Sequence, residues 1–335
     1  MKRWQFWLGV VISAGFLYLA LRGLHLDEVW GTIRQANFLW IFPGVVIYFV
    51  GVWVRAWRWK FMLHPIKNIS VKTMFPIVCI GYMGNNIYPA RAGEVLRAVV
   101  LKKREGVPIS ASLATVIVER IFDGVVMLGF VILNLPGLTK QISDNTVVDR
   151  IYALTLWGSL AFLGALAVFL LAAMFPARGE LVANFFIGHL VPQRWREKIL
   201  AIVQRFLTGL EFLRSPQEVL LIFFSTILIW LLETGKYWFV MLAFPFQISF
   251  LALMLVNGVI NLATMIPSAP GYIGTFDALG IALLKAYHVA GEIAAGYTLL
   301  LHVALWLPIT ALGAYYFARE GLSWDSAQRQ RLAEE

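Results

Sequence analysis

A short polar segment between two apolar stretches restricts the folds open to this chain. Residues 84–94 read GNNIYPARAGE, with two asparagines, a proline, two glycines and an Arg/Glu pair. In hydrocarbon, irregular polar backbone is tolerated only where protein buries it or where it lines a cavity. A second interruption, at residues 261–277, reads NLATMIPSAPGYIGTFD. Paired breaks in two halves of a membrane protein are typical of a binding site near the bilayer midplane.

The composition identifies the environment of these breaks. Of the 335 residues, 60% are hydrophobic and 14% are charged, and several uncharged runs approach the span length of about 20 residues. We therefore predict an all-α polytopic membrane protein and exclude a large soluble enzyme. The net charge of +9 does not indicate nucleic-acid binding, because no soluble domain carries interleaved basic and aromatic residues. The basic residues act instead as a topology signal.

The pattern predicts about six full spans and two re-entrant helical hairpins. The uninterrupted helices are expected at about 4–24, 38–60, 109–135, 151–175, 217–243 and 292–318. The hairpins are expected at 73–103 and 249–287. In the first, a 12-residue helix over 73–84 would reach about 18 Å, roughly half of the hydrocarbon core. It would turn at Asn85–Gly93 and return.

The distribution of basic residues predicts the orientation. With these spans, 20 Lys and Arg residues lie on one side and 5 on the other, and the count assigns Arg55, Arg58 and Arg97 to the basic side. The positive-inside rule then places both termini in the cytoplasm and the chain in the cytoplasmic (inner) membrane. Segments 66–72 and 102–106 should both be cytoplasmic.

The order of elements predicts an inverted repeat within one transmembrane domain, residues 1–325, followed by a cytoplasmic tail, 326–335. Repeat 1 covers about 4–136 and repeat 2 about 151–318, and each reads helix, helix, broken hairpin, helix. Such repeats place two hairpins against each other near the midplane. Residues 194–214 have the apolar spacing of an amphipathic helix, which lies either on the cytoplasmic membrane surface or against its own bundle.

The candidate substrate-binding residues are the ionisable groups at membrane depth together with Asn85 of the first turn. Ionisable groups at this depth are costly and usually face a cavity or each other. The candidates are Asn85, Arg91, Glu94, Glu119, Arg120, Asp123 and Asp277. Together with Glu233 and Lys236, the ionised groups comprise three cations and five acids, a net charge of −2 that favours a cationic headgroup or bound protons. A carboxylate whose pKa burial raises, at Glu119 or Asp123, would carry a coupling proton.

Structural roles are alternatives for several of these groups. Glu94 and Asp277 stand where an acid caps a helix, and Arg91 with Glu94 would lock the first hairpin to the third span. Glu233 and Lys236, three residues apart, would pair with each other. His302 reads as a satisfied core histidine, and Trp53, Trp57 and Trp59 read as interface anchors. The structural turns are expected at Pro89, Gly93, Pro267 and Gly271, with Gly93 and Gly271 beginning the return helices.

Known catalytic patterns are absent from the sequence. There is no H-E-x-x-H, no G-x-S-x-G, no Walker loop and no Cys/His cluster. We therefore expect no enzymatic activity, no metal and no cofactor.

Three motifs resemble a known family. They are N-x-x-x-P-x-R-x-G-E-x-x-R from Asn85 to Arg97, E-R-x-x-D from Glu119 to Asp123, and P-x-x-P-G-x-x-G from Pro267 to Gly274. Most of the chain resembles the flippase-like family typified by the transmembrane domain of lysylphosphatidylglycerol synthases. The family often has a Glu where this chain has Asp277. We expect a stand-alone member without the aminoacyl-transferase domain.

The resemblance implies that the chain moves lipid between leaflets. The leading hypothesis is translocation of a lipid with a polar headgroup through a charged midplane cavity, with that lipid as the substrate and no nucleic-acid partner. A membrane-embedded enzyme acting on a lipid-linked substrate is the first alternative, with Glu94, Glu119 or Asp123 as general base. The second is a non-catalytic partner of a lipid-synthesis enzyme.

Overall fold

The computed structural model describes Gly15, Leu17, Tyr18 and residues 21–89, 91–139, 145–264 and 270–319. Within these residues the chain is helical and contains no strand, as the sequence predicts. The α-helices are α2 (Leu26–Gln35), α3 (Ile41–Leu63), α4 (Val71–Ile87), α5 (Ala92–Glu105), α6 (Ile109–Thr139), α7 (Asn145–Met174), α8 (Pro176–Leu190), α9 (Gln193–Thr208), α10 (Pro216–Met241), α11 (Phe250–Ala263), α12 (Thr275–Ala286) and α13 (Gly291–Arg319). Short 3₁₀ turns are η1 (Phe38–Trp40), η2 (Glu211–Arg214) and η3 (Pro270–Tyr272).

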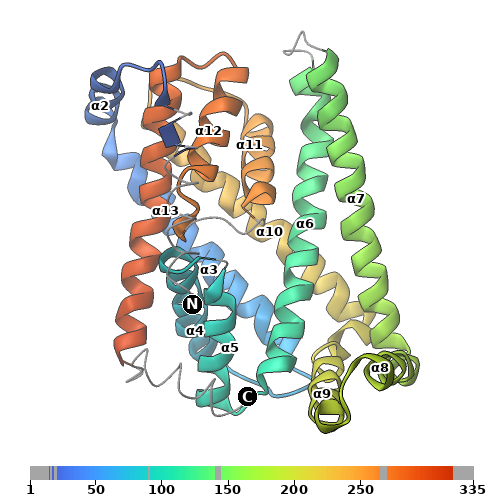
Figure 1. The fold of residues 1–335 in the computed structure, drawn as a ribbon. Helices are drawn as coiled ribbons and strands as arrows, with labels where there is room; N and C mark the ends of the chain where they lie inside the picture. Colours follow the sequence, from blue (N-terminus) through green and yellow to red (C-terminus); the bar gives the residue numbers. More distant parts are fainter. Residues whose placement is uncertain are drawn as a thin grey trace.

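Long apolar helices form the body of the molecule. Among the described residues, four are long and apolar enough to cross a membrane: Phe38–Leu63, Thr155–Met174, Pro216–Met241 and Gly291–Arg319. Helix α6, of 31 residues, runs alongside α7 over the same height (Figure 1). These helices coincide with five of the predicted spans. The predicted first span falls mostly, and the predicted tail 326–335 wholly, outside the described residues, as does Pro267.

The first interruption forms a helical hairpin. Helices α4 and α5 pack against each other and occupy the lower part of the bundle (Figure 1). Lys67 before α4 and Glu105 at the end of α5 form an ion pair of 2.9 Å, so both ends of the hairpin lie at the same end of the molecule. Helix α4 has 17 residues, because the chain stays helical through the two asparagines. The predicted 12-residue helix was therefore too short, and the turn is confined to 88–91.

The second interruption forms a matching hairpin in the upper part of the bundle (Figure 1). Helices α11 and α12 contact each other, and η3 lies between them in the chain. Gly271 belongs to this 3₁₀ turn, and α12 begins at Thr275 with Gly274 as its N-cap. The expectation that Gly271 begins the return helix was wrong: two further residues with positive φ, Tyr272 and Gly274, delay the helix start.

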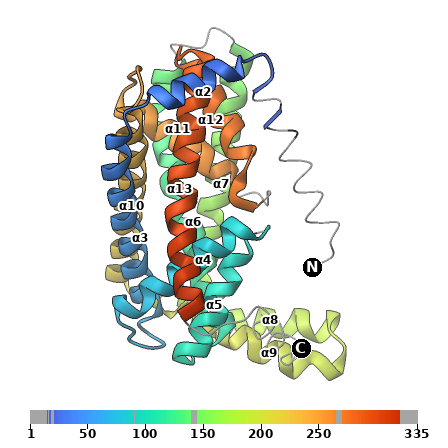
Figure 2. The same cartoon turned by 90° about the vertical axis from the view of Figure 1, so that its left-hand side faces the viewer.

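The two hairpins pack crosswise. Helix α13 contacts α4, the first helix of the lower hairpin, while α6 contacts α11, the first helix of the upper one. Helices α3 and α10 run side by side along one side of the bundle, at the left of Figure 2. Each hairpin is thus enclosed by long helices from both halves of the chain. This arrangement brings the tips of both hairpins to the middle of the bundle.

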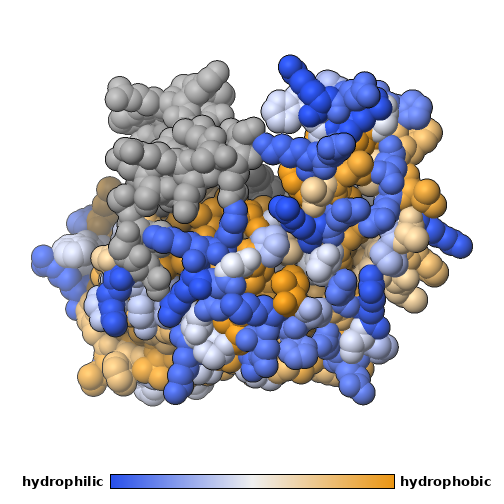
Figure 3. Space-filling view, turned by 90° about the horizontal axis from the view of Figure 1, so that it is seen from below, coloured by the Kyte–Doolittle hydropathy of each residue, from blue (hydrophilic) through white to orange (hydrophobic). Residues whose placement is uncertain are grey.

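The lower end contains two helices, α8 and α9, whereas the sequence pattern predicted only the amphipathic segment 194–214 there. Helices α8 and α9 contact each other and extend sideways from the long helices (Figure 2). In the predicted amphipathic segment, Phe206 packs against the core and Leu210 and Leu213 are buried. Packing against the bundle is therefore the observed arrangement for this part. Hydrophilic residues cover much of this lower face (Figure 3), which includes exposed Lys103, Arg194 and Lys198.

Candidate functional site

The two hairpins and four long helices, α3, α6, α10 and α13, surround a pocket of about 130 Å³ that is lined by several charged side chains. Its lining includes Asn85 from α4, Arg91 from the first turn, Glu94 from α5 and Tyr272 from the second turn. Polar contacts close the junction between the halves. Asn86 Nδ2 donates to Thr310 Oγ1 at 2.8 Å, and Trp306 Nε1 donates to the Asn86 carbonyl at 3.4 Å.

Both hairpin tips hold a non-glycine residue in the left-handed backbone region. Arg91 has φ of 55° and Tyr272 has φ of 60°, and both line the pocket. A side chain in this region strains the backbone by on the order of 1–3 kcal/mol, and such strain concentrates at functional sites. Gly93 permits the first tip by a different means, since a Cβ there would overlap the Gly81 carbonyl and the Asn85 backbone. The tips are therefore shaped for the pocket as well as for turning the chain.

A buried ionic network forms one side of the pocket. Arg58 contacts Glu119 and Asp123, each at 2.9 Å, and none of these side chains is more than 2% exposed. Arg97 Nη2 donates to Glu119 Oε2 at 2.8 Å. Arg120 Nη2 lies 3.1 Å from Asp123 Oδ2. Charges buried this deeply remain ionised only when they are paired, so the network ties α3, α5 and α6 together.

Aromatic and hydroxyl groups complete the network. The Arg97 guanidinium lies 4.6 Å from the centre of the Trp59 ring, a cation–π contact. Trp59 Nε1 donates to Thr115 Oγ1 at 2.9 Å, and its side chain is fully buried. The expectation that Trp59 anchors the membrane interface was wrong, because α3 continues as a helix to Leu63 and buries this face.

A second ionic group faces the pocket from α3 and α10. Glu233 pairs with Lys236, as the spacing predicts, and also with Arg55 Nη2 at 2.9 Å. Lys236 lies 4.4 Å from the centre of the Tyr48 ring. These contacts place two cations around one carboxylate.

The third group joins the second hairpin to α13. Asp277 Oδ2 accepts from the Gly274 backbone N–H at 2.9 Å, which confirms its predicted capping role. Its Oδ1 lies 2.8 Å from Nδ1 of His302. The other ring nitrogen, Nε2, lies 2.8 Å from the Gly271 carbonyl. Both ring nitrogens of His302 thus face a polar partner, as expected for a core histidine, and the side chain also lines the pocket.

The predicted site residues occupy two layers. Asn85, Arg91, Glu94 and Arg120 line the pocket. Glu119, Asp123 and Asp277 do not line it; they lie buried behind it and hold the side chains that do. Glu94 accepts from Arg91 Nε at 2.9 Å and lies 3.7 Å from Arg120 Nε. The first tip is therefore tied to α6, which was the structural alternative for this pair.

The observed network reverses the predicted charge balance. Arg55, Arg58 and Arg97 are at most 6% exposed, so their assignment to a cytoplasmic loop was wrong. Among the described residues the network and pocket hold six cations: Arg55, Arg58, Arg91, Arg97, Arg120 and Lys236. They hold five carboxylates: Glu94, Glu119, Asp123, Glu233 and Asp277. The net charge, with His302 neutral, is +1 instead of −2, which favours an anionic ligand over a cationic one.

A local signal exists for one of the missed arginines, Arg55. Residues Val52, Arg55, Ala56 and Trp59 follow helical spacing and are all buried, so Arg55 extends an apolar face instead of ending it. Removing the three buried arginines from the count lowers the number of Lys and Arg residues on the lower side, which still exceeds that on the upper side.

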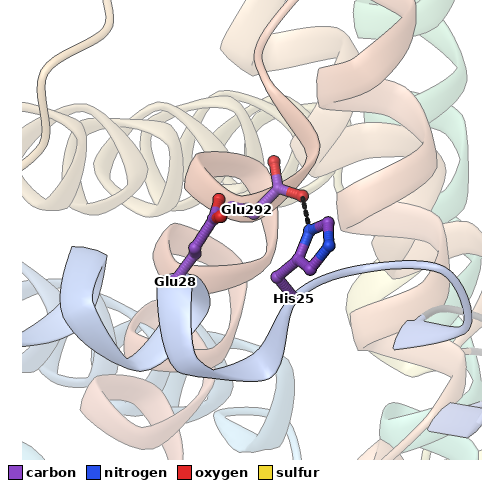
Figure 4. Close-up of side chains that lie close together, drawn as sticks. All are labelled: His25, Glu28 and Glu292. Carbon is purple, nitrogen blue, oxygen red and sulfur yellow. Dashed lines mark ion pairs between the residues drawn. The ribbon is translucent and has the colours of Figure 1, made fainter.

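A separate group of titratable residues lies at the upper end. His25, Glu28 and Glu292 bring their ligand atoms within 4.8 Å of one another where α2 meets α13 (Figure 4). His25 Nδ1 lies 4.0 Å from Glu292 Oε1, but the His25 side chain is 72% exposed. An exposed pair of this kind contributes at most about 1 kcal/mol, so we assign it no site.

Comparisons with known proteins agree with this architecture. A family model described as the lysylphosphatidylglycerol synthase TM region matches residues 6–313. A UPF0104 membrane protein of Methanocaldococcus jannaschii is 22% identical over 311 residues, covering 91% of each chain. Another from Pyrococcus horikoshii is 24% identical, covering 92% of this chain and 95% of that one. Glycosyltransferase AglD of Haloferax volcanii is 26% identical, covering 80% of this chain but only 47% of its own length.

Proposed function

This chain belongs to the family defined by the transmembrane region of lysylphosphatidylglycerol synthases, and from this premise we propose that it translocates a lipid with an anionic headgroup across the cytoplasmic membrane. The observation that carries the proposal is the pocket between the hairpin tips, where the buried network holds six cations against five carboxylates. A charged headgroup is the expensive part of a lipid to move through hydrocarbon. Paired charges that surround it replace its hydration.

Unsatisfied polar atoms support a ligand at this place. Asn85 Oδ1 and Arg97 Nε are buried without a hydrogen-bond partner, and both residues line the pocket. Buried polar groups in folded proteins are normally satisfied by protein, water or ligand. A phosphate offers acceptors for the arginine donors, and the hydroxyl groups of a headgroup alcohol such as glycerol offer donors for the amide oxygen.

Crosswise packing supports an inverted repeat as the means of alternating access. In this proposal α3, the α4–α5 hairpin and α6 correspond to α10, the α11–α12 hairpin and α13. The packing of α13 on α4 then corresponds to that of α6 on α11. The two hairpins enter the bilayer from opposite sides, and rocking one repeat against the other exposes the pocket to each leaflet in turn. The basic lower end faces the cytoplasm.

The test is translocation by the purified protein in liposomes. We expect faster movement of a fluorescent phosphatidylglycerol, which has a net negative headgroup, than of a fluorescent phosphatidylcholine, which is zwitterionic. Protein-free liposomes measure the background. Equal rates for both lipids would contradict the anionic preference, and background rates for both would contradict translocation of these lipids.

A membrane-embedded enzyme is the second candidate, favoured by the name of one relative, the glycosyltransferase of Haloferax volcanii, of which this chain covers about half. Mass spectrometry of the same liposomes separates the two: translocation leaves the lipid mass unchanged, whereas catalysis changes it. A synthase that co-purifies with the chain, with neither activity present, would support a partner role.

A further inference from the structure

The hydrogen bonds of His302 require a proton that a neutral imidazole beside a carboxylate does not supply. Nε2 faces the Gly271 carbonyl and Nδ1 faces Asp277 Oδ1, each at 2.8 Å. A carbonyl oxygen and an ionised carboxylate only accept hydrogen bonds, and a neutral imidazole has only one N–H. In a neutral ring, the nitrogen without a hydrogen would therefore place its lone pair against a lone pair of the oxygen that it faces. An imidazolium donates to both.

We propose that His302 is held as an imidazolium and that the His302–Asp277 pair is the proton-binding site of this protein. Oδ2 of Asp277 accepts from the Gly274 N–H, which orients the carboxylate so that Oδ1 faces Nδ1 of His302. The Phe276 ring, with its centroid 4.6 Å from that of the imidazole, offers a further favourable contact to a cation. The His302 side chain is 12% exposed and lines the pocket, so the proton exchanges with the pocket.

The proton controls the attachment of the second hairpin to α13. With it, His302 donates to the Gly271 carbonyl in the turn and to Asp277 in the first turn of α12. Without it, one of these contacts loses its hydrogen and becomes repulsive. Deprotonation therefore loosens the η3 turn from α13. The part of the pocket wall formed by the η3 turn should therefore be held firmly at low pH and less firmly at high pH.

Charges on the neighbouring elements couple the proton to the cargo. The other charged groups in the pocket are Arg55 and Lys236 beside Glu233, Arg91 and Arg120 beside Glu94, and Arg97, which pairs with the buried Glu119. The lining tyrosines are neutral at ordinary pH, and the described part of α2 adds no group to the lining. This excess of cations opposes an imidazolium. An anionic headgroup in the pocket offsets it, so the headgroup and the proton strengthen each other's binding, as linkage requires.

The protonation state is measurable without any transport. Four histidines, His25, His64, His189 and His288, are exposed. Replacing the first three by Gln and His288, which has φ of 59°, by Asn leaves His302 as the sole histidine. Solid-state NMR of this ¹⁵N-histidine-labelled protein in bilayers at about pH 7, where free imidazole is mostly neutral, should show both ring nitrogens protonated. A neutral ring in this protein would overturn the proposal.

The matched variant is Asp277→Asn. Asparagine keeps an oxygen for the Gly274 N–H, and its amide donates to Nδ1, so we expect the His302 ring to become neutral while the cap remains. An imidazolium that persists in a folded Asp277→Asn protein would show that the carboxylate does not hold the proton. If this variant fails to fold, the spectrum of the single-histidine protein still decides the assignment.

The link to translocation rests on the proposed function and is tested separately. We expect the liposome rate for phosphatidylglycerol to fall as the pH is raised, and Asp277→Asn to remove most of that dependence. A pH-independent rate in the wild type would overturn the coupling while leaving the proton site to the NMR result. If no lipid moves at any pH, the proposed cargo fails, and the NMR result stands independently of it.

Discussion

Nη1 of Arg58 lies 2.9 Å from Oδ1 of Asp123, and neither side chain is exposed. Nη1 also donates to Thr226 Oγ1 at 2.6 Å. This single guanidinium therefore joins α3, α6 and α10, two of which come from one half of the chain and one from the other. The pocket-lining arginines are positioned by carboxylates that this contact holds in place.

Removing the Arg58 charge should destabilise the fold. Arg58→Gln leaves Asp123 with Arg120 as its remaining charge partner and removes one of the three arginine contacts of Glu119. Breaking a buried pair costs about 3–5 kcal/mol. We expect a clear loss of monodisperse protein after detergent extraction and a lower thermal midpoint. Lys103→Gln, on an exposed lysine, is the control and should behave as the wild type. Equal behaviour of both variants would contradict the structural role.

Glu119 should also act through stability. Its carboxylate contacts Arg58, Arg97 and Arg120 at once and does not line the pocket. Glu119→Gln leaves these guanidinium groups with less charge compensation, so we expect reduced folded yield, on the order of the same 3–5 kcal/mol. Size-exclusion recovery after extraction measures it. Normal recovery together with lost translocation would instead place Glu119 in contact with the headgroup.

Arg91 allows the charge to be removed without a backbone penalty. Because its φ is 55°, glycine at this position is favoured by about 1 kcal/mol or more. We expect Arg91→Gly to keep or raise the thermal midpoint while translocation of phosphatidylglycerol falls. His288→Gly relieves a similar backbone conformation outside the pocket, at φ of 59°, and should keep full translocation. Full translocation in both variants would remove Arg91 from the substrate path.

Sequence reasoning located the hairpins because their breaks are local. Asn85–Gly93 interrupts an apolar run, and no neighbouring segment is needed to see it. The helix ends were less predictable, since α4 continues through Asn85 and Asn86 where Asn86 is held by Trp306 and Thr310 of α13. That partner is 220 residues or more away in the chain, and a local pattern does not reveal it.

Part of the candidate site could be predicted by the same reasoning. Arg91, Glu94 and Arg120 stand in or beside apolar segments and are recognisable as misplaced charges. Arg55 and Arg97 stand in segments that carry several basic residues, where arginine normally reaches water. Helical spacing places Arg55 on an apolar face, but only tertiary packing shows that both side chains are buried. The sign of the pocket charge, which depends on them, therefore had to come from the structure.

Close backbone packing at the first tip predicts a sharp response to a single methyl group. In Gly93→Ala the new Cβ would overlap the Gly81 carbonyl and the Asn85 backbone, which are helical and unable to move independently. We expect loss of folded protein. Gly129→Ala on α6 meets nothing within 4 Å and should be neutral or stabilising by about 0.5–1 kcal/mol. A normal yield of Gly93→Ala would show that the α4–α5 crossing is looser than described.

The membrane topology of both hairpins can be tested with four single cysteines in a Cys79→Ala background. Asn68 and Lys103 are exposed at the two ends of the first hairpin, and Gln247 and Ala290 are exposed at the two ends of the second. The Lys67–Glu105 pair fixes the first two positions on one side, and the basic excess assigns that side to the cytoplasm.

In intact cells, an impermeant thiol reagent should label cysteines at 247 and 290 but not those at 68 and 103, which should react only after permeabilisation. Labelling that separates 68 from 103 would mean that the first hairpin crosses the membrane, and the inverted repeat would fail with it. Labelling that separates 247 from 290 would do the same for the second hairpin. Labelling of all four before permeabilisation would indicate leaky cells. A cytosolic marker protein with one cysteine detects such leakage in the same sample.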